Sequence, residues 1–280
     1  MSIERKLSFA LTGTKLQTEH RSICDAMGGS LPALSSFNRE AYSSGALAEA
    51  ISFWRTRTLA EHRSVAVFLL LATQLIEANA PLDAKTVMVK LAQDEFRHTE
   101  LCGQMLVALG SETPVVIDVA VKPLATHAGC SLEERALRNV LYTTCLSEMI
   151  ATARLVDTLE HTRDKFARAT TRLIIRDEVM HGQFGFLYLD ACSEYLSQHP
   201  DVTESLAVYL VHAFAVLEKE LASDALRTMP SPSAEAMELG VIDPQRAIEV
   251  FYGTMEHVVV PALEQRGIAA EHAWKHRTMS

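Results

Sequence analysis

Residues that interrupt helices are scarce in this sequence, which has 12 glycines and 9 prolines among 280 residues. Strand patterns are nearly absent as well, because the long stretches rich in Ala, Leu, Glu and Arg follow helical spacing. The sequence therefore predicts an all-α fold. Its hydrophobic composition of 48% is enough to bury the core of one large domain, and we expect residues 1–280 to form one.

Cysteine motifs are missing too. The five cysteines are an odd number, and none belongs to a Cys-x-x-Cys pair. This pattern disfavours a disulfide framework or a zinc knuckle and suits reduced thiols. Reduced thiols are typical of the cytosol, so we expect a cytoplasmic protein. The five residues are Cys24, Cys102, Cys130, Cys145 and Cys192.

The sequence also lacks a dense basic block and a long apolar segment. Its 26 basic side chains are outnumbered by 35 acidic ones, for a net charge of -9, which makes nucleic acid a poor partner. The longest apolar segment, 64–76, is shorter than the ~20 residues needed to cross a bilayer. Residues 1–13 have no small-residue cleavage site, so we expect no signal peptide. Neither nucleic acid nor a membrane is an expected partner.

Helical periodicity divides the chain into six long segments. The first four are expected to form a bundle over 44–197, between an N-terminal arm (1–43) and appended C-terminal helices (198–280). The connection 110–130 is too long for a helix hairpin and predicts a crossover along the bundle. The predicted helices are 44–78, 83–109, 131–161, 165–197, 202–226 and 244–266.

Capping residues mark where two of these helices begin. Ser131 and Glu134 have the spacing of a capping box at the start of the third helix. Asp243 and Pro244 are typical of a cap and of the first helical position, and they open the last helix.

The motif Glu-x-x-His occurs twice, as Glu95 to His98 and as Glu178 to His181. Residues three apart share a face of a helix, so each motif directs one carboxylate and one imidazole to the same point. One motif alone is weak support for a site, because Glu and His at this spacing are common on solvated helix faces.

Two further glutamates lie where antiparallel partner helices would place them. Reflecting Glu95 through a turn near residue 78 gives Glu61, and reflecting Glu178 through a turn near Arg163 gives Glu148. Packing the two hairpins together then brings four carboxylates and two imidazoles into one core. Because buried carboxylates repel one another unless cations neutralise them, the sequence predicts two bound metal ions. The predicted ligands are Glu61, Glu95, His98, Glu148, Glu178 and His181.

An aspartate precedes each motif. Asp94 and Asp177 each lie four residues before a predicted ligand histidine. Each is positioned to accept a hydrogen bond from the imidazole N–H that does not face the metal, either within its own helix or across the bundle. An ion pair with Arg97 or Arg176 is the alternative. Because the placement recurs in both halves, we favour the contact with histidine.

The pattern Glu, Glu-x-x-His, Glu, Glu-x-x-His over Glu61 to His181 resembles that of the ferritin-like superfamily of carboxylate-bridged di-iron proteins. The resemblance implies a ferritin-like four-helix bundle that holds two iron ions, with an Mn/Fe or Mn/Mn pair as the alternative. It also implies O2 activation by the reduced metal pair. The superfamily spans oxidases, hydroxylases, N-oxygenases, desaturases, aldehyde-deformylating oxygenases, bacterioferritins, rubrerythrins and manganese catalases, and the pattern does not choose among them.

Departures from the patterns of single families narrow this range. Ribonucleotide reductase small subunits carry a radical-forming tyrosine four residues after the first ligand histidine, where this chain has Cys102. That cysteine, together with Thr152 four residues after Glu148, resembles the hydroxylase subunits of bacterial multicomponent monooxygenases. The resemblance implies catalytic roles for both, with Thr152 as a proton relay; a small buried hydrophobe and an ordinary helix threonine are the alternatives. Ile174 stands where the seven-ligand N-oxygenases have an additional histidine.

Other residues near the predicted site have two interpretations. His62 points about 100° around the helix from Glu61, so it is left out of the ligand set. His212 and His257 could cover the site, although hydrogen bonding within the core is favoured. Four more residues could line a substrate pocket or simply belong to the bundle core, which is favoured for each singly. These are Val65, Phe68, Leu141 and Cys145.

The leading hypothesis for function is a di-iron oxidase or monooxygenase that reduces O2 and oxidises a small organic substrate. Because the sequence lacks a Gly-x-Gly-x-x-Gly motif and an iron–sulfur cysteine cluster, electrons would come from a separate donor protein. A ferroxidase or iron-handling subunit is the second hypothesis, which the C-terminal helices disfavour. A manganese catalase is the third. A homodimer is compatible with each of them.

Overall fold

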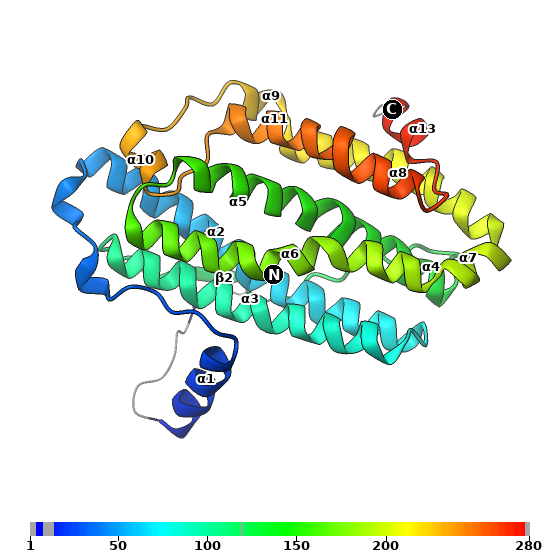
Figure 1. Ribbon diagram of the computed structural model, residues 1–280, viewed down its shortest axis with the longest axis horizontal. Helices are drawn as coiled ribbons and strands as arrows, with labels where there is room; N and C mark the ends of the chain where they lie inside the picture. The colour runs from blue at the N-terminus through cyan, green and yellow to red at the C-terminus, as the bar shows by residue number, and fades with distance from the viewer. Residues whose placement is uncertain (1–3, 8–13, 119, 278–280) are drawn as a thin grey trace.

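Helices dominate the computed structural model, which describes residues 4–7, 14–118 and 120–277. Within these ranges the only strands are two segments of three residues, β1 (Glu4–Lys6) and β2 (Val116–Asp118). The prediction of an all-α fold is therefore confirmed. The long helices run roughly along the longest axis of the molecule (Figure 1).

Four helical columns lie side by side in the bundle (Figure 1). Their elements are α2 (Ser44–Glu77), α3 (Leu82–Ala108), α4 (Leu132–Val140) continued by η3 (Leu141–Glu148) and α5 (Met149–His161), and α6 (Lys165–Ala191). α2 packs against α3 and α4, while α6 packs against α3, η3 and α5. The columns lie close to the predicted ranges, but two details differ. The third contains a π-helical segment, η3, and the fourth ends at Ala191 instead of 197.

Local side-chain and backbone features explain where these columns begin and end. Asn79 follows α2 with a φ of 49°, a left-handed conformation that asparagine tolerates better than most residues. The Asp164 carboxylate accepts two backbone N–H groups in the first turn of α6. Ser131 caps α4 as predicted, but the Glu134 carboxylate pairs with Arg138 at 2.6 Å instead of returning to the cap.

The C-terminal part of the chain covers one side of the bundle, where α11 packs on α5 and α8 packs on α4 (Figure 1). Its elements are α7 (Ser193–Gln198), α8 (Pro200–Leu221), α9 (Asp224–Arg227), α10 (Ala234–Glu238), α11 (Pro244–Thr254), η4 (Met255–Val259), α12 (Val260–Glu264) and α13 (Ala270–Lys275). The predicted helix 202–226 is divided into α8 and α9, whereas α11, η4 and α12 follow one another without interruption over 244–264, close to the predicted 244–266. α8 starts at Pro200. Proline suits the first helical position, because the N–H group that it lacks would have no partner within the helix there.

The N-terminal arm is tied to the predicted crossover. β1 pairs with β2 in antiparallel fashion, and β2 lies inside the connection 110–130, where no strand was predicted. Arg55 on α2 fastens the same connection by donating to the Pro114 carbonyl at 2.8 Å. The rest of the arm holds α1 (Lys15–Ala26) and two short 3-10 turns, η1 (Leu34–Ser36) and η2 (Arg39–Ala41).

Two stretches are long and apolar enough to cross a membrane by length and composition, Ser44–Glu77 and Pro200–Arg227. A core helix meets the same criterion. α2 carries eleven buried residues, which lie at helical spacing on one side of the helix.

The hydrophobic core is divided into two clusters along the columns. One contains Phe68 of α2 and Phe184 of α6, and the other contains Trp54 of α2 and Phe166 of α6. Between them, each column carries buried polar side chains instead of apolar ones. The bundle therefore has a polar layer near its middle, and this layer is where the predicted ligands lie.

Candidate metal centre

The six predicted ligands meet in the polar layer. Glu61 comes from α2, Glu95 and His98 from α3, Glu148 from the last position of η3, and Glu178 and His181 from α6. Their donor atoms form two overlapping groups, and within each group these atoms lie within 4.8 Å of one another. The first group contains Glu61, Glu95, His98 and Glu178; the second contains Glu95, Glu148, Glu178 and His181. Glu95 and Glu178 are thus shared by both groups.

Both histidines present the Nδ1 atom to the carboxylates. His98 Nδ1 lies 3.4 Å from Glu178 and 3.6 Å from Glu61. His181 Nδ1 lies 3.0 Å from Glu95 and 3.3 Å from Glu178. The two imidazole rings are 5.6 Å apart, so each marks its own half of the site.

The site is buried and its polar atoms are short of partners. Glu95, Glu178 and both histidines are at most 2% exposed. Among the described residues, no hydrogen-bond partner is found for the Nδ1 atoms of the two histidines or for the Oε2 atoms of Glu95 and Glu178. Buried polar atoms without partners are costly, and cations between them would satisfy all four. Carboxylate oxygens and imidazole nitrogens are suitable metal ligands, so the residues present fit two bound metal ions.

Two of the four carboxylates and both imidazoles have raised pKa values, which favour their protonated forms when no cation is present. Burial, reinforced by neighbouring carboxylates, raises the pKa of Glu95 well above its usual value and that of Glu148 to about 8. Burial alone would lower the pKa values of His98 and His181, but the surrounding carboxylates outweigh it and raise both. Metal ions would therefore displace protons on binding.

The two aspartates contact the histidines across the bundle. Asp94 on α3 lies 3.2 Å from His181 Nε2, and Asp177 on α6 lies 3.5 Å from His98 Nε2. Each histidine thus directs Nδ1 into the site and Nε2 toward an aspartate. The alternative ion pair is also present at Asp177, which Arg176 contacts at 2.8 Å and Arg97 at 3.4 Å.

The π-helical segment places Glu148. η3 ends at this residue, and π-helical turns are frequent at functional sites because the extra residue changes the direction of the side chains. α6 approaches η3 closely, since a Cβ atom at Gly185 would lie 2.3 Å from Cys145 Sγ and from Thr144 Oγ1. The Glu148 carboxylate is buried with the other donor atoms of its group, although the residue as a whole is partly exposed.

Arg57 is a site residue that the sequence reasoning missed. It lies one turn before Glu61 on α2, and its guanidinium is 2.7 Å from the Glu61 carboxylate. Burial would raise the pKa of Glu61, but the neighbouring Arg57 and His98 outweigh it and lower the pKa. The spacing of four residues before a predicted ligand was the signal that could have found Arg57.

Thr152 and Cys102 both lie beside the site. The Thr152 hydroxyl is 2.8 Å from the Glu148 carbonyl and 3.1 Å from the Glu178 carbonyl, so it contacts the backbone of two predicted ligands. Cys102 is fully buried, and burial, followed by the charge of Glu61, raises the pKa of its thiol well above the usual value. A catalytic role for either residue stays a prediction.

The remaining candidates are not part of the cluster of carboxylates and imidazoles. Phe68, Leu141 and Cys145 are fully buried in the apolar core, as favoured for them, and Phe68 packs edge-on against His181 at 5.2 Å. His212 and His257 are exposed on the outer side of their helices, so the expectation of core hydrogen bonds was wrong. In the amphipathic C-terminal helices both positions fall on the solvent side.

The comparisons with known proteins add no family. Neither a scan against models of protein families nor a search of curated proteins finds a match. The fold and the site together define a helical protein with a buried carboxylate and histidine cluster that could bind metal ions. This cluster resembles a carboxylate-bridged metal site.

Proposed function

We propose that this chain is a ferritin-like di-iron oxidase or monooxygenase that uses O2 to oxidise a small organic substrate. The observation that carries the proposal is the sharing of Glu95 and Glu178 between the two donor groups. Each group then adds one glutamate and one histidine of its own. Ferritin-like di-metal bundles have this composition, with one Glu from each of two helices and one Glu-x-x-His motif from each of the others.

The proposed fold rests on the same columns. α3 and α6 carry the two Glu-x-x-His motifs, α2 and η3 carry the single glutamates, and a long connection joins the two hairpins. This order agrees with a four-helix bundle that has one crossover. The C-terminal helices on one side of it favour an enzyme over the subunit of a storage shell.

A bound pair of reduced iron ions would supply the electrons and the open coordination positions that O2 reduction needs. The chain itself would arrange and protect this chemistry. Asp94 and Asp177 would hold the imidazoles in one tautomer, with Nδ1 toward the metal. The two apolar clusters on either side of the site would exclude water.

Other parts of the proposal concern partners. Electrons would come from a separate donor protein, and the substrate would be a small organic molecule. Iron is favoured because four carboxylates and two imidazoles suit it, although manganese accepts the same donors. A cytoplasmic location would supply the reduced metal and is part of the proposal.

The test is anaerobic loading with Fe2+, followed by metal analysis and measurement of O2 consumption with a chemical reductant. We expect two iron ions per chain, and loss of the metal-dependent O2 consumption in Glu148→Ala and His181→Ala with helix content largely unchanged. Glu160→Ala, an exposed glutamate on α5, is the matched control and should behave like the original chain.

Two results would contradict the proposal. Well under two equivalents of iron in the loaded protein would reject the di-metal site. Full activity in either ligand variant would remove that residue from it. Rapid consumption of peroxide by the manganese-loaded protein without added reductant would instead identify a catalase.

A further inference from the structure

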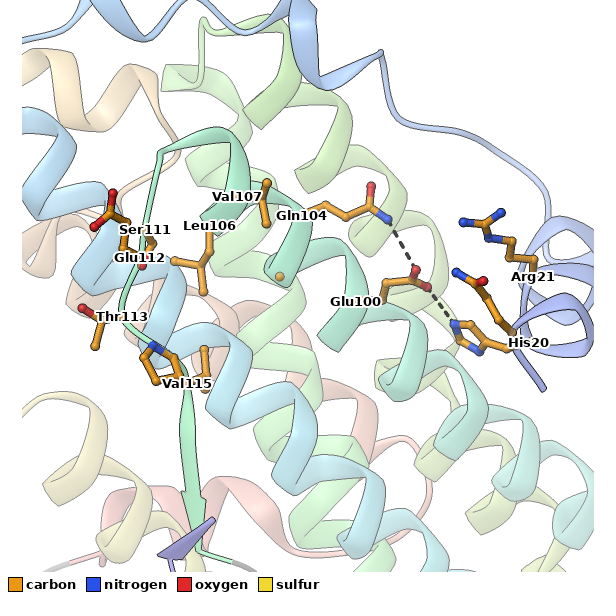
Figure 2. A pocket seen from close by; sticks show the side chains of 13 residues that line it. His20, Arg21, Glu100, Gln104, Leu106, Val107, Ser111, Glu112, Thr113 and Val115 are labelled. Carbon is orange, nitrogen blue, oxygen red and sulfur yellow. Dashed lines mark hydrogen bonds and ion pairs between the residues drawn. The ribbon is translucent and has the colours of Figure 1, made fainter. Parts of the chain in front are cut away.

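A second group of metal-ligating side chains lies outside the polar layer, between α1 and α3. His20 and Cys24 come from α1 and Glu100 comes from α3, and all three are partly buried. Figure 2 shows the His20 and Glu100 side chains reaching toward each other from the two helices. The group is independent of the proposed function, because Glu100 is two residues after His98 and points about 200° around the helix from it.

The donor atoms of this group are compactly arranged. His20 Nε2 lies 3.1 Å from Glu100 Oε2. Cys24 Sγ lies 3.7 Å from each of these two atoms. The other oxygen, Glu100 Oε1, accepts from Gln104 at 3.5 Å, which leaves Oε2 directed at the α1 residues.

These separations are close to those that a tetrahedral metal ion imposes. A zinc ion with bonds of about 2.3 Å to sulfur and about 2.1 Å to nitrogen and oxygen keeps its donor atoms about 3.4 to 3.6 Å apart. A histidine and a cysteine four residues apart share one face of a helix, so α1 presents both donors to Glu100 at once. Three protein ligands of these types leave a fourth position for water.

Open space lies next to this fourth position. Cavities of about 400 Å³ and about 290 Å³ border the group, and His20 and Glu100 line both of them. Figure 2 shows the larger one, which continues along α3 past Gln104 and Val107 to Val115. A water molecule or a small ligand can therefore reach a metal ion held by the three side chains.

We propose that His20, Cys24 and Glu100 form a binding site for a single zinc-like divalent cation that fastens α1 to α3. α1 needs such a fastening, because it has 12 residues, none of them buried, and an isolated helix of this length is marginal in water. Small elements without a core of their own are commonly stabilised by a metal ion. Burial and the nearby Glu100 raise the pKa of the Cys24 thiol to about 11, so the cation displaces a proton when it binds.

Cobalt(II) is the probe for the site, because a thiolate ligand gives it an intense charge-transfer absorption that carboxylates and imidazoles do not give. Titration of the full chain with Co2+ should produce this band, with a final intensity that corresponds to one thiolate-bound Co2+ per chain. The band should be lost in Cys24→Ser and retained in Cys130→Ser, which removes a different partly buried thiol.

The variant His181→Ala tests whether this site is independent of the one in the polar layer, because it removes a predicted ligand of the latter only. The variant should keep the thiolate band, whatever happens to the metal ions between the columns. Absence of the band in the original chain would overturn the proposal. Its persistence in Cys24→Ser would also overturn it, because the thiolate would then belong to another cysteine such as Cys102.

Amide hydrogen exchange of α1 is the second measurement. Saturation with Zn2+ should slow exchange over residues 15–26 by roughly tenfold or more, because the cation binds only the docked helix. The slowing should vanish in Cys24→Ser. Identical exchange with and without Zn2+ in the original chain would mean that hydrogen bonds alone join these residues, and the proposal would fail.

Discussion

Asp94 and Asp177 each precede the histidine of their own helix by four residues, yet each contacts the histidine of the other helix. α3 therefore orients a ligand of α6, and α6 orients a ligand of α3. Because each aspartate contacts the histidine of the other hairpin, neither hairpin orients its own imidazole alone. Lys90 at 2.5 Å from Asp94 keeps that carboxylate in place from the outer side.

The first prediction concerns these aspartates. Asp94→Asn and Asp177→Asn should each weaken metal binding by about 10- to 100-fold, because an amide holds the imidazole N–H less strongly than a carboxylate does. Competition with a chelator of known affinity measures the change. Asp190→Asn is the control, since Asp190 lies on α6 but pairs with Arg266 at the surface. Unchanged metal affinity in both variants would show that the contacts with histidine are not used.

The second prediction concerns Thr152. Its hydroxyl donates to the carbonyls of Glu148 and Glu178, so it lies beside the backbone of two predicted ligands. Thr152→Val keeps the shape and should bind both metal ions, but we expect slower O2 consumption or more peroxide per turnover. Positioned proton donors typically contribute ~10²–10⁴-fold in rate. Thr152→Ser should restore the original kinetics.

A purely structural threonine gives a different result. Loss of its hydrogen bonds in Thr152→Val would then lower thermal stability without changing coupling between O2 consumption and product formation. Unaltered turnover and coupling in the fully loaded variant would reject the relay.

At the scale of the elements, the contact between α6 and η3 decides where Glu148 lies. Gly185 allows the backbones to approach until only a hydrogen fits opposite Cys145 and Thr144. Thr144 is held in place because its hydroxyl donates to the Val140 carbonyl at 2.8 Å. The direction of the predicted ligand Glu148 therefore depends on a glycine in a neighbouring helix.

The third prediction is that Gly185→Ala destabilises the protein by about 1–3 kcal/mol, because its Cβ overlaps buried atoms that have little room to move. Chemical denaturation measures this free energy of unfolding, and the displaced η3 should also weaken metal binding. Gly253→Ala in α11 is the control, since nothing lies within 4 Å of its Cβ. There alanine should be neutral or stabilising by up to ~1 kcal/mol. Equal stability of the two variants would reject close packing at η3.

Glu61 and Glu148 were predicted by counting equal numbers of residues on either side of each turn. This succeeded because both helix hairpins are regular between the glutamates that were paired in this way. The π-helical segment ends at Glu148, so its irregularity lies outside the stretch from Glu148 to Glu178 and did not disturb the spacing. The segment itself was not predictable, because it depends on how closely Gly185 lets α6 approach. The same limit applies to β1 and β2, whose pairing joins residues more than a hundred positions apart.

At the scale of the whole molecule, the polar layer divides the apolar core into two clusters. Without cations, this layer remains buried only by holding protons on Glu95, Glu148 and the two histidines. Bound metal ions would replace these protons and join the four columns. The stability of the molecule should therefore depend on metal and on pH together.

The last prediction follows from the sign of these pKa shifts. Glu148 has its pKa raised to about 8 in the folded chain, so between its unfolded value of about 4.3 and about 8 the folded state binds a proton that the unfolded state releases. Stability from this group is then present at low pH and is lost as pH rises toward about 8. The raised pKa values of His98 and His181 act in the same direction above about 6.5.

Metal-free protein should accordingly have a lower melting temperature at about pH 8 than at about pH 6, while metal-loaded protein should change little, because cations hold the carboxylates ionised at both values. The increase in melting temperature on loading should thus be larger at the higher pH, and loading near neutral pH should release roughly two protons per metal ion. Calorimetry and a pH indicator in weak buffer measure the two effects. Glu148→Gln removes one of the titrating groups, so it should reduce both the proton release and the pH dependence of the metal-free protein. A melting temperature of the metal-free chain that rises between these pH values would mean that the buried carboxylates are already ionised without metal, and the proposed exchange of protons for cations would be rejected.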